Sequence, residues 1–191
     1  MSPRTEKQFK EIRETKKELI LNTALEEFAE HGYHATSISK ISNKANISKG
    51  LIYNYFESKE DVLKSIINKG LSVMTEAYNP NKFEEITEDV FEFIVEQTFL
   101  VLKKNRHFWK LYFSIIMKSG VSEIIKDPIK KYFEPFIFKM LEYYKKQGKE
   151  NPMANALLFG AMLDGISINY ILHPEMYPLE DIKKLLIQKF K

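Results

Sequence analysis

Apolar residues recur along this chain at intervals of three and four positions. In the first segment they form one stripe, which consists of Phe9, Ile12, Ile20, Leu21, Ala24, Leu25 and Phe28. Such a stripe covers one face of an α-helix, whereas a half-buried strand alternates apolar and polar residues with a period of two. The same spacing predicts helices over about 62–74, 83–104, 106–118, 122–147, 153–172 and 179–190. No run alternates for long, so the sequence predicts an all-α fold of about nine helices.

Capping residues and prolines predict where several of these helices begin and end. Thr5 with Gln8 three positions later matches a capping box, and Gly32 is typical of a helix end. Pro128 and Pro135 fall near a helical pattern, where we expect one to start a helix and the other to kink it.

Residues 33–57 differ from the long helices around them, because they predict two short helices joined by a turn. Thr36 or Ser37 is expected to cap the first short helix, and Ser48 the second. Asn46 lies between them, and asparagine is among the few non-glycine residues that tolerate a positive φ. Apolar residues on both helices can close a small core: Ile38, Ile41, Ala45, Ile47, Ile52 and Phe56. This layout is a helix-turn-helix.

Charge is distributed unevenly along the chain. The formal net charge is only +3, from 29 basic and 26 acidic residues. Between Gly32 and Phe56, however, there is no acidic residue, and the cations are Lys40, Lys44 and Lys49. A local basic face of this kind neutralises nucleic-acid phosphates, and that neutralisation supplies much of the affinity for DNA.

With its apolar positions turned inward, the second short helix leaves one set of residues facing outward. Tyr53 can donate to a phosphate, Asn54 can reach a base edge, and Leu51 can meet a thymine methyl group. Glycine allows the backbone to approach a ligand closely. The outward-facing set is Lys49, Gly50, Leu51, Tyr53 and Asn54.

Other chemistries are disfavoured by what the sequence lacks. Cysteine is absent, which removes disulfides, thiolate zinc sites and cysteine nucleophiles. The four histidines are scattered and match no HExxH or Glu-x-x-His pattern, so we predict no metal, no cofactor and no catalytic residue. The first 20 residues lack the apolar core of a secretory signal, and 154–172 contains Asn155, Asp164 and Asn169. We therefore expect a cytoplasmic protein with no membrane-spanning helix.

Taken together, these residues resemble the N-terminal DNA-binding domain of the tetracycline-repressor (TetR) family. The matching positions cover the first third of the chain: Gly32, Tyr33, Thr36, Ile41, Ala45, Ile47, Ser48, Lys49, Gly50, Ile52, Tyr53, Phe56, Ser58, Lys59, Glu60 and Leu63. The sequence departs from the family pattern at Asn46, where glycine is usual, at Ser42, where alanine is common, and at Tyr55, where histidine is frequent.

The resemblance implies a DNA-binding domain over 1–57 and a ligand-binding and dimerisation domain over 58–191. A homodimer would form through the last two long helices, about 153–190, and would bind a palindromic DNA operator. By the same resemblance Thr36 and Lys59 would hold phosphates. The complete set of expected DNA-binding residues is Thr36, Ser37, Ser48, Lys49, Gly50, Leu51, Tyr53, Asn54 and Lys59. The function that the resemblance implies is that of a ligand-responsive transcriptional regulator, a repressor that a small-molecule effector releases from its operator.

The C-terminal domain is rich in large apolar side chains. If some of them line a cavity, its walls would suit an apolar or aromatic effector with few polar anchors. The expected effector-binding set is Phe91, Phe99, Phe108, Trp109, Tyr112, Phe113, Met117, Phe136 and Met140. Any one of these side chains is explained equally well as ordinary core.

Two other classes of function remain open. An enzyme built on a helical scaffold is disfavoured, because the sequence shows no nucleophile–base pair, phosphate loop or metal cluster. A helical protein-interaction module with a non-functional DNA-binding head would share the predicted fold. Salt-dependent binding to DNA separates the regulator from the interaction module.

Overall fold

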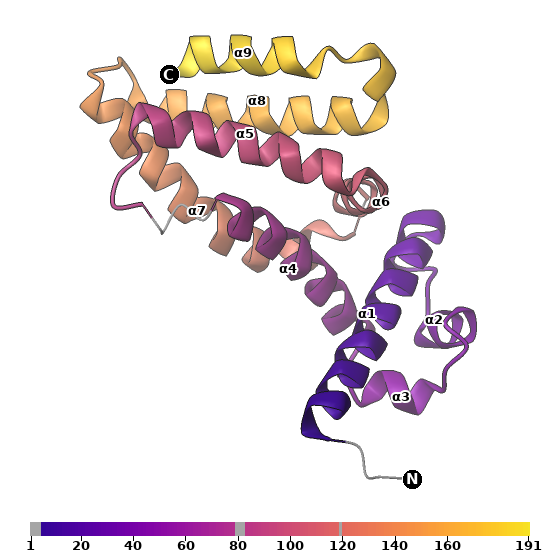
Figure 1. Ribbon diagram of the computed structural model, residues 1–191. Coiled ribbons are helices and arrows are strands. Elements are labelled where there is room, and N and C mark those ends of the chain that lie inside the picture. Colours follow the sequence, from indigo (N-terminus) through magenta and orange to yellow (C-terminus); the bar gives the residue numbers. More distant parts are fainter. Residues whose placement is uncertain (1–4, 79–82, 119) are drawn as a thin grey trace. The chain divides into compact units, whose positions relative to one another are not determined.

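The structure is a computed structural model that describes residues 5–78, 83–118 and 120–191. Within these residues the chain forms nine α-helices and no strand, which confirms the all-α prediction (Figure 1). Most predicted ranges agree closely with the observed helices, but α4 (Lys59–Tyr78) extends beyond the predicted 62–74 at both ends, and α5 (Glu88–Lys104) begins later than expected. Its start is fixed by Thr87, whose side chain accepts a hydrogen bond from Val90 N.

The chain packs into two compact units. Unit 1 runs to Asn68 and also includes Ser114–Ile125, and unit 2 comprises Lys69–Phe113 and Lys126–Lys191. Three helices contribute residues to both units: α4 (Lys59–Tyr78), α6 (Arg106–Ile116) and α7 (Ser122–Lys146). The predicted boundary between residues 57 and 58 does not coincide with the limits of these units.

Unit 1 is built on α1 (Glu6–His31), with α2 (Ile38–Lys44) and α3 (Lys49–Tyr53) on one side of it (Figure 1). Its buried side chains include Ile20, Ala24, Phe28, Ile41, Ile52 and Leu63, each with no exposed surface. Of the apolar residues predicted to close a small core, Ile41, Ile52 and Phe56 are buried, while Ile38, Ala45 and Ile47 are half-buried.

The two ends of α1 follow the predicted signals. Thr5 and Gln8 form the complete capping box, in which each side chain accepts the backbone N–H of the other residue. At the other end Gly32 has a φ of +85°, and its N–H donates to Phe28 O at 3.0 Å. Glycine adopts a positive φ with little strain, which explains why it stands at the end of this helix.

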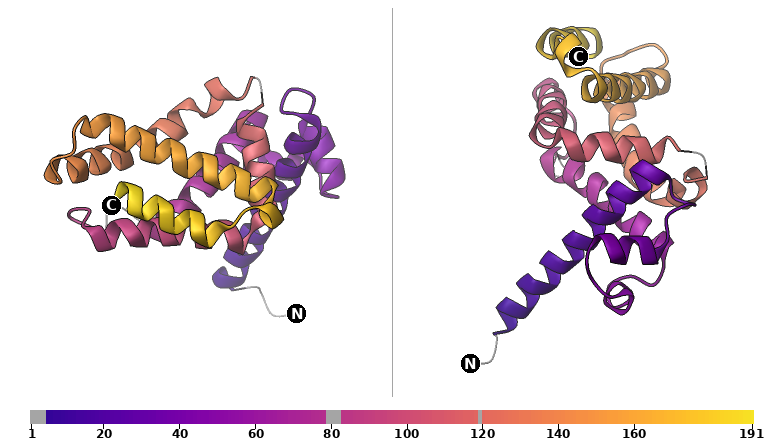
Figure 2. Two further views of the ribbon diagram at one scale, coloured as in Figure 1. Left: turned by 90° about the horizontal axis from the view of Figure 1, so that it is seen from above. Right: turned by 90° about the vertical axis from the view of Figure 1, so that its right-hand side faces the viewer.

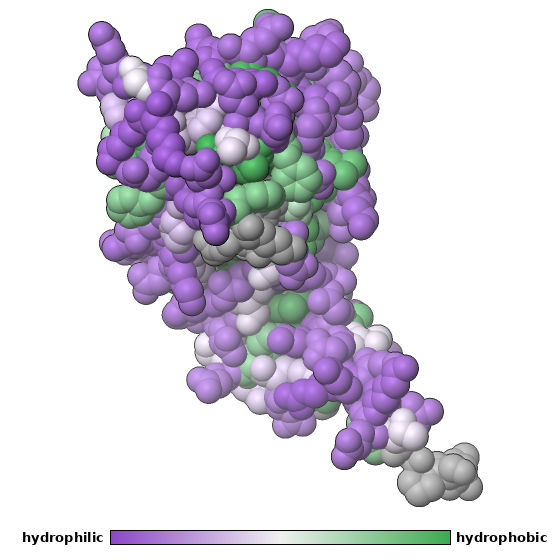
Figure 3. Space-filling view, turned by 60° about the vertical axis from the view of Figure 1, so that its left-hand side comes forward, coloured by the Kyte–Doolittle hydropathy of each residue, from purple (hydrophilic) through white to green (hydrophobic). Residues whose placement is uncertain are grey.

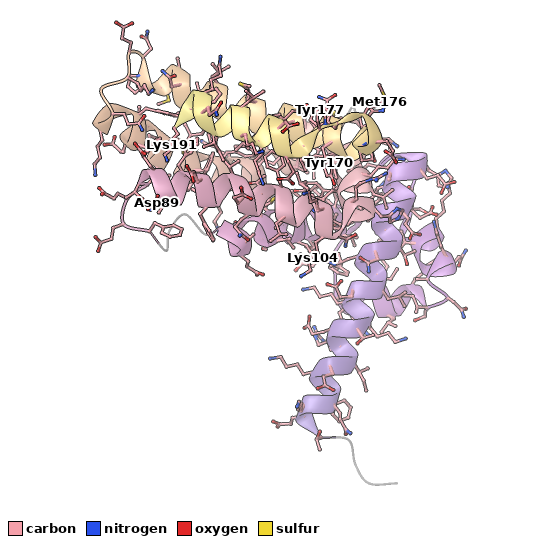
Figure 4. All side chains as sticks on the ribbon, turned by 45° about the horizontal axis from the view of Figure 1, so that its top comes forward. Asp89, Lys104, Tyr170, Met176, Tyr177 and Lys191 are labelled. Carbon is pink, nitrogen blue, oxygen red and sulfur yellow. The ribbon has the colours of Figure 1, made fainter. Side chains whose placement is uncertain are left out.

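In unit 2, α8 (Pro152–Leu172) and α9 (Leu179–Phe190) lie side by side and antiparallel, joined by the short 3-10 helix η2 (Pro174–Met176) (Figure 2). Both helices pack against α5. Figure 4 shows Lys191, at the end of α9, beside the first turns of α5. Its ammonium pairs there with Glu88 at 3.2 Å and with Glu92 at 2.7 Å.

The prediction for the two prolines of α7 is wrong in part. Pro128 does not start a helix, because α7 begins at Ser122 and continues through both Pro128 and Pro135. A proline inside a helix removes one backbone hydrogen bond and crowds the preceding turn. The helix continues because it buries Ile125 ahead of the prolines and Phe136, Met140 and Tyr144 after them.

By length and composition, α8 is apolar enough to cross a membrane. The structure gives this helix a different setting, because one of its faces is packed inside unit 2. The packed face consists of Ala156, Phe159, Gly160, Leu163, Ile166, Ser167 and Ile171. The apolar residues on that face of α8 therefore form part of the core of unit 2.

Candidate nucleic-acid interface

Side-chain caps and one left-handed residue fix the local geometry of the helix-turn-helix. Ser37 Oγ accepts a hydrogen bond from Lys40 N at 3.2 Å, and Ser48 Oγ accepts one from Leu51 N at 3.1 Å. Between the helices, Asn46 has a φ of +52°, as its place in the turn predicts. The caps satisfy backbone N–H groups that would otherwise lack a partner at the start of α2 and α3.

The two faces of α3 differ in burial. Ile52 has no exposed surface, and Phe56 just beyond the helix is 3% exposed. Tyr53, on the other face, is 56% exposed. The remaining residues of the predicted outward set share that exposed side, with Leu51 half-buried and Lys49, Gly50 and Asn54 exposed. The fold therefore gathers this set on one surface, and their contact with DNA stays a prediction.

The packing of unit 1 does not require glycine at position 50. A Cβ built there would meet Ser48 Oγ at 3.9 Å, which is an ordinary van der Waals distance. The lack of a side chain at Gly50 instead leaves the backbone of α3 open to close approach from outside.

The side chain of Thr36 is placed differently from the phosphate-binding role that we predicted. Thr36 is 1% exposed, and its hydroxyl lies near two backbone oxygens, Glu27 O at 3.1 Å and Gly32 O at 2.9 Å. The hydroxyl proton is directed to these carbonyls at the end of α1, so the side chain is not presented to a ligand. The cap of α2 is the neighbouring Ser37.

Lys59 also serves the fold rather than presenting its ammonium group outward. Lys59 Nζ donates to Tyr33 O and Thr36 O, both at 2.8 Å, and lies 4.3 Å from the centroid of the Tyr33 ring. Burial lowers the pKa of this lysine. Because its donors are taken up by the loop between α1 and α2, a phosphate would have to displace these bonds.

Two of the three lysines on the acid-free segment are likewise engaged within unit 1. Lys44 Nζ pairs with Glu27 at 3.0 Å and Glu26 at 3.3 Å, and the hydrogen bond to Glu27 raises the pKa of the lysine. Lys40 Nζ donates to Ala35 O at 3.0 Å. The basic face is therefore weaker than the sequence indicated, because glutamates distant in the sequence neutralise part of it.

The residues predicted to bind an effector do not form one surface. Six of them are at most 6% exposed and belong to the core of unit 2: Phe91, Phe99, Trp109, Tyr112, Phe136 and Met140. Phe108 and Phe113 are half-buried. Met117 lies in unit 1 and is 67% exposed, so it does not line an interior cavity of unit 2, contrary to the prediction. The aromatic residues pack closely on one another, as Phe91 does on Phe159 with ring centroids 4.7 Å apart.

A surface groove of about 320 Å³ lies elsewhere in unit 2, between the segment before α5 and the C-terminal half of α7. It is lined by Glu84, Glu85, Ile86, Phe138, Lys139, Glu142, Tyr143 and Lys146. Figure 3 shows that the surface is largely hydrophilic, with apolar side chains exposed among the polar ones. None of the lining residues was predicted, because they come from two segments distant in the sequence and include five charged side chains.

The sequence of unit 1 matches a known family. Residues 20–66 match the model described as "Bacterial regulatory proteins, tetR family". The match runs from the middle of α1 through the helix-turn-helix into α4.

Residues 20–66 thus carry a regulatory domain of the TetR family. The fatty acid metabolism regulator protein of Bacillus subtilis is 23% identical over 185 residues, which cover 88% of this chain and 90% of that protein. The similarity to that regulator therefore extends through the C-terminal half of the chain. Both comparisons indicate transcriptional regulators.

Solved structures agree with the TetR fold over nearly the whole chain. The fatty acid degradation regulator FadR from Bacillus halodurans superimposes with a TM-score of 0.73 at 24% identity, covering 92% of this chain and 94% of that one. FadR from Bacillus subtilis, solved in complex with stearoyl-CoA, gives a TM-score of 0.72 at 21% identity, covering 90% and 96%. At these identities the likeness establishes the fold alone.

A second, exposed face of α8 is also largely apolar. Ala161, Asp164 and Leu172 lie on it at helical spacing, together with Leu157, which is 54% exposed. Asp164 is reached by solvent, yet the dense surroundings of the helix desolvate its carboxylate and raise its pKa to about 6. The only sign of this shift in the sequence is the position of one carboxylate in an apolar helix.

One group of potential metal ligands escaped the sequence patterns. Side-chain atoms of Glu27, Glu30 and His31 lie within 4.8 Å of one another at the end of α1. Glu27 and Glu30 stand four residues and one residue before His31, so the group matches neither HExxH nor Glu-x-x-His. Lys44 already neutralises Glu27 at 3.0 Å, and we assign the carboxylate to that ion pair.

Proposed function

We propose that this chain is a ligand-responsive transcriptional repressor that binds a palindromic DNA operator as a homodimer. The observation that carries the proposal is the exposed face of α3, where Lys49, Tyr53 and Asn54 lie together beyond a buried Ile52. A short helix with these side chains fits the major groove, with Lys49 and Tyr53 on phosphates and Asn54 on a base edge.

Gly50 supports the same orientation of α3. Because unit 1 has room for a side chain at that position, the packing does not explain the glycine. Close approach of the α3 backbone to the duplex does explain it. Leu51 would then meet an apolar group of a base, and Ser37 and Ser48 would offer hydroxyls at the starts of α2 and α3.

The exposed face of α8 supports the homodimer. Leu157 and Leu158 are 54% and 50% exposed, and Leu185 on α9 is 64% exposed. A two-fold pairing of α8 and α9 with their copies would bury these side chains in a four-helix interface. Two DNA-binding heads in one dimer would reach half-sites about 34 Å apart, which is one turn of the duplex.

An apolar effector is supported by the interior of unit 2 and by one structural relative. Tyr144 has no exposed surface, and its hydroxyl finds no hydrogen-bond partner among the described residues. A buried hydroxyl without a partner is costly, so it marks a point at which a bound molecule would supply the missing hydrogen bond. Since the FadR structure from Bacillus subtilis contains stearoyl-CoA, a long-chain acyl thioester is the first effector to test.

Release of DNA would follow from helices that belong to both units. In unit 1, Lys118 Nζ donates to Phe28 O and Ala29 O, the terminal carbonyls of α1. Lys118 follows directly on α6, most of which lies in unit 2. An effector that binds one conformation of unit 2 more tightly than another shifts the equilibrium toward the conformation it prefers. The coupling free energy between effector binding and DNA binding is typically about 1–3 kcal/mol. We place this action in the cytoplasm, where the DNA is.

The proposal is tested by selecting bound duplexes from a random DNA pool. We expect a palindromic consensus whose half-sites are about 10 bp apart, and binding that weakens as salt increases. Addition of stearoyl-CoA is the first test of release. Failure to enrich any sequence, together with salt-independent retention of the pool, would favour the interaction module instead.

A further inference from the structure

Most lysines around α3 are engaged within unit 1. Lys40, Lys44 and Lys59 all donate to groups of that unit. Lys49 is exposed and makes no ion pair or hydrogen bond through its ammonium within the described residues. Since affinity for DNA grows with the number of phosphates neutralised, cations of unit 1 outside the helix-turn-helix are candidates for further phosphate contacts.

The first four turns of α1 carry two parallel stripes of opposite charge. Lys10, Arg13 and Lys17 follow the spacing i, i+3, i+7. One residue later, the same spacing gives the acidic stripe of Glu11, Glu14 and Glu18. Because each residue turns an α-helix by about 100°, the two stripes stand about 100° apart around α1. The charges of this segment nearly cancel in sum but are separated in space.

The basic stripe lies on the side of α1 that faces the helix-turn-helix. It continues at helical spacing into Ile20, Leu21, Ala24 and Phe28, which are at most 4% exposed. That buried face packs on α2. The basic stripe is thus the extension of the packed face of α1 beyond the end of the unit 1 core.

Arg13 places the stripe next to α3. Its guanidinium carbon lies 4.9 Å from the centroid of the Tyr55 ring, and Tyr55 follows the end of α3 by two residues. Within the described residues Lys10, Arg13 and Lys17 make no ion pair, and both Lys10 and Arg13 are exposed. The stripe therefore runs beside the end of α3, the helix that carries Tyr53.

We propose that Lys10, Arg13 and Lys17 form a second phosphate-binding surface, which contacts the backbone of the duplex that α3 enters. This inference rests on the proposed function. The stripe spans seven residues of helix, about 10 Å, while phosphates of one strand advance by about 3.4 Å along the duplex axis. The stripe is therefore long enough to reach more than one phosphate of a strand. Such contacts position α3 and carry no base specificity.

The test uses the full chain and a labelled duplex of random sequence, about 30 bp long, whose binding is measured over a series of salt concentrations. Lys10→Ala and Arg13→Ala are each expected to lower the slope of log affinity against log salt by about 0.9, the value for one phosphate contact. Arg13→Lys keeps the charge and is expected to retain the wild-type slope. Alanine favours the helix at these exposed positions, and thermal unfolding followed by circular dichroism verifies that the variants fold.

Lys184→Ala is the control. Lys184 carries the same charge and is exposed on α9, outside unit 1. Its slope is expected to equal that of the wild type. The inference is overturned if Lys10→Ala and Arg13→Ala keep the wild-type slope while Lys49→Ala lowers it, an outcome that leaves the proposed function intact. It is also overturned if Lys184→Ala lowers the slope equally. If the wild-type chain binds no duplex at low salt, both this inference and the proposed function fail.

Discussion

The hydroxyl of Thr36 and the ammonium of Lys59 are both directed at backbone carbonyls around the end of α1. Most of these carbonyls, those of Gly32, Tyr33 and Thr36, lie in the loop after the helix, where helical hydrogen bonds are lacking. The two side chains therefore hold the loop that sets the position of α2. At the scale of single residues, these two polar side chains stabilise the loop that positions the proposed DNA-binding surface, and they are not part of that surface themselves.

Replacement of the Thr36 hydroxyl tests this structural role. Thr36→Val keeps the shape of the side chain but leaves Glu27 O and Gly32 O without their donor, and we expect a loss of about 1–3 kcal/mol of unfolding free energy. Thr36→Ser keeps the hydroxyl and is expected to lose less. Urea denaturation measures both variants. Equal stability of the valine and serine variants would contradict the role assigned to the hydroxyl.

Residue roles were predictable where the partner is close in sequence. Ser37 and Ser48 cap helices three residues away, and Asn46 closes a turn with its own backbone, so local rules identify all three. Thr36 and Lys59 find partners up to nine and 26 residues away. No local pattern specifies those distances, and the family resemblance pointed to phosphates instead.

The helix α8 shows two environments on one element. One face is packed in unit 2, and the other carries exposed leucines at helical spacing with Asp164 among them. A carboxylate in such surroundings is more costly to ionise than one in water, which is why its pKa rises to about 6. The helix thereby gains a dependence on pH that its apolar residues alone would not give.

The raised pKa of Asp164 predicts the sign of a pH effect on stability. Because the folded state holds this proton up to about pH 6 and the unfolded state releases it near pH 3.8, the unfolding free energy contributed by Asp164 falls as pH rises between these values. Asp164→Asn is therefore expected to stabilise the chain above pH 6, with the gain vanishing toward pH 4. Solvent reaches the carboxylate, so the expected gain is about 1 kcal/mol rather than the full value of the shift. Urea midpoints at pH 4.5 and 7.5 measure it, and a gain that is equal at both pH values would contradict the assignment.

Helix bounds followed from the sequence where a cap or a glycine marks the end. The capping box of Thr5 and Gln8 and the positive φ of Gly32 were both identified in advance. The extent of α7 followed from the apolar spacing, which predicted a helix over 122–147. The expectation that Pro128 or Pro135 starts a helix was wrong, because packing of the residues around them keeps the helix continuous. Tertiary packing overrides a local preference of a few kcal/mol in this way.

At the scale of the whole molecule, the proposed repressor depends on contacts between two copies of the chain. The exposed leucines of α8 and α9 belong to unit 2, while the DNA-binding residues belong to unit 1. Dimerisation would therefore act on DNA affinity through geometry alone, by holding two copies of α3 one duplex turn apart. The surface that joins the copies need not touch DNA.

A charge placed on the exposed face of α8 tests the dimer. Leu157→Glu would bury a carboxylate in the proposed interface, so we expect a monomer at micromolar concentration and weaker binding to a two-half-site duplex. Leu100→Glu is the control, since Leu100 on α5 is 56% exposed and lies outside that face. Sedimentation velocity gives the oligomeric state of both. A wild-type chain that sediments as a monomer would contradict the proposed dimer.

The central claim is that the exposed face of α3 reads the major groove, and one measurement addresses it directly. A duplex selected from a random pool is titrated with the wild-type chain and with Lys49→Ala, Tyr53→Ala and the distant control Lys184→Ala, whose residue is exposed on α9. We predict that Lys49→Ala and Tyr53→Ala each weaken binding about tenfold with unchanged urea midpoints, while Lys184→Ala binds as the wild type does. Wild-type affinity in both α3 variants would contradict the account.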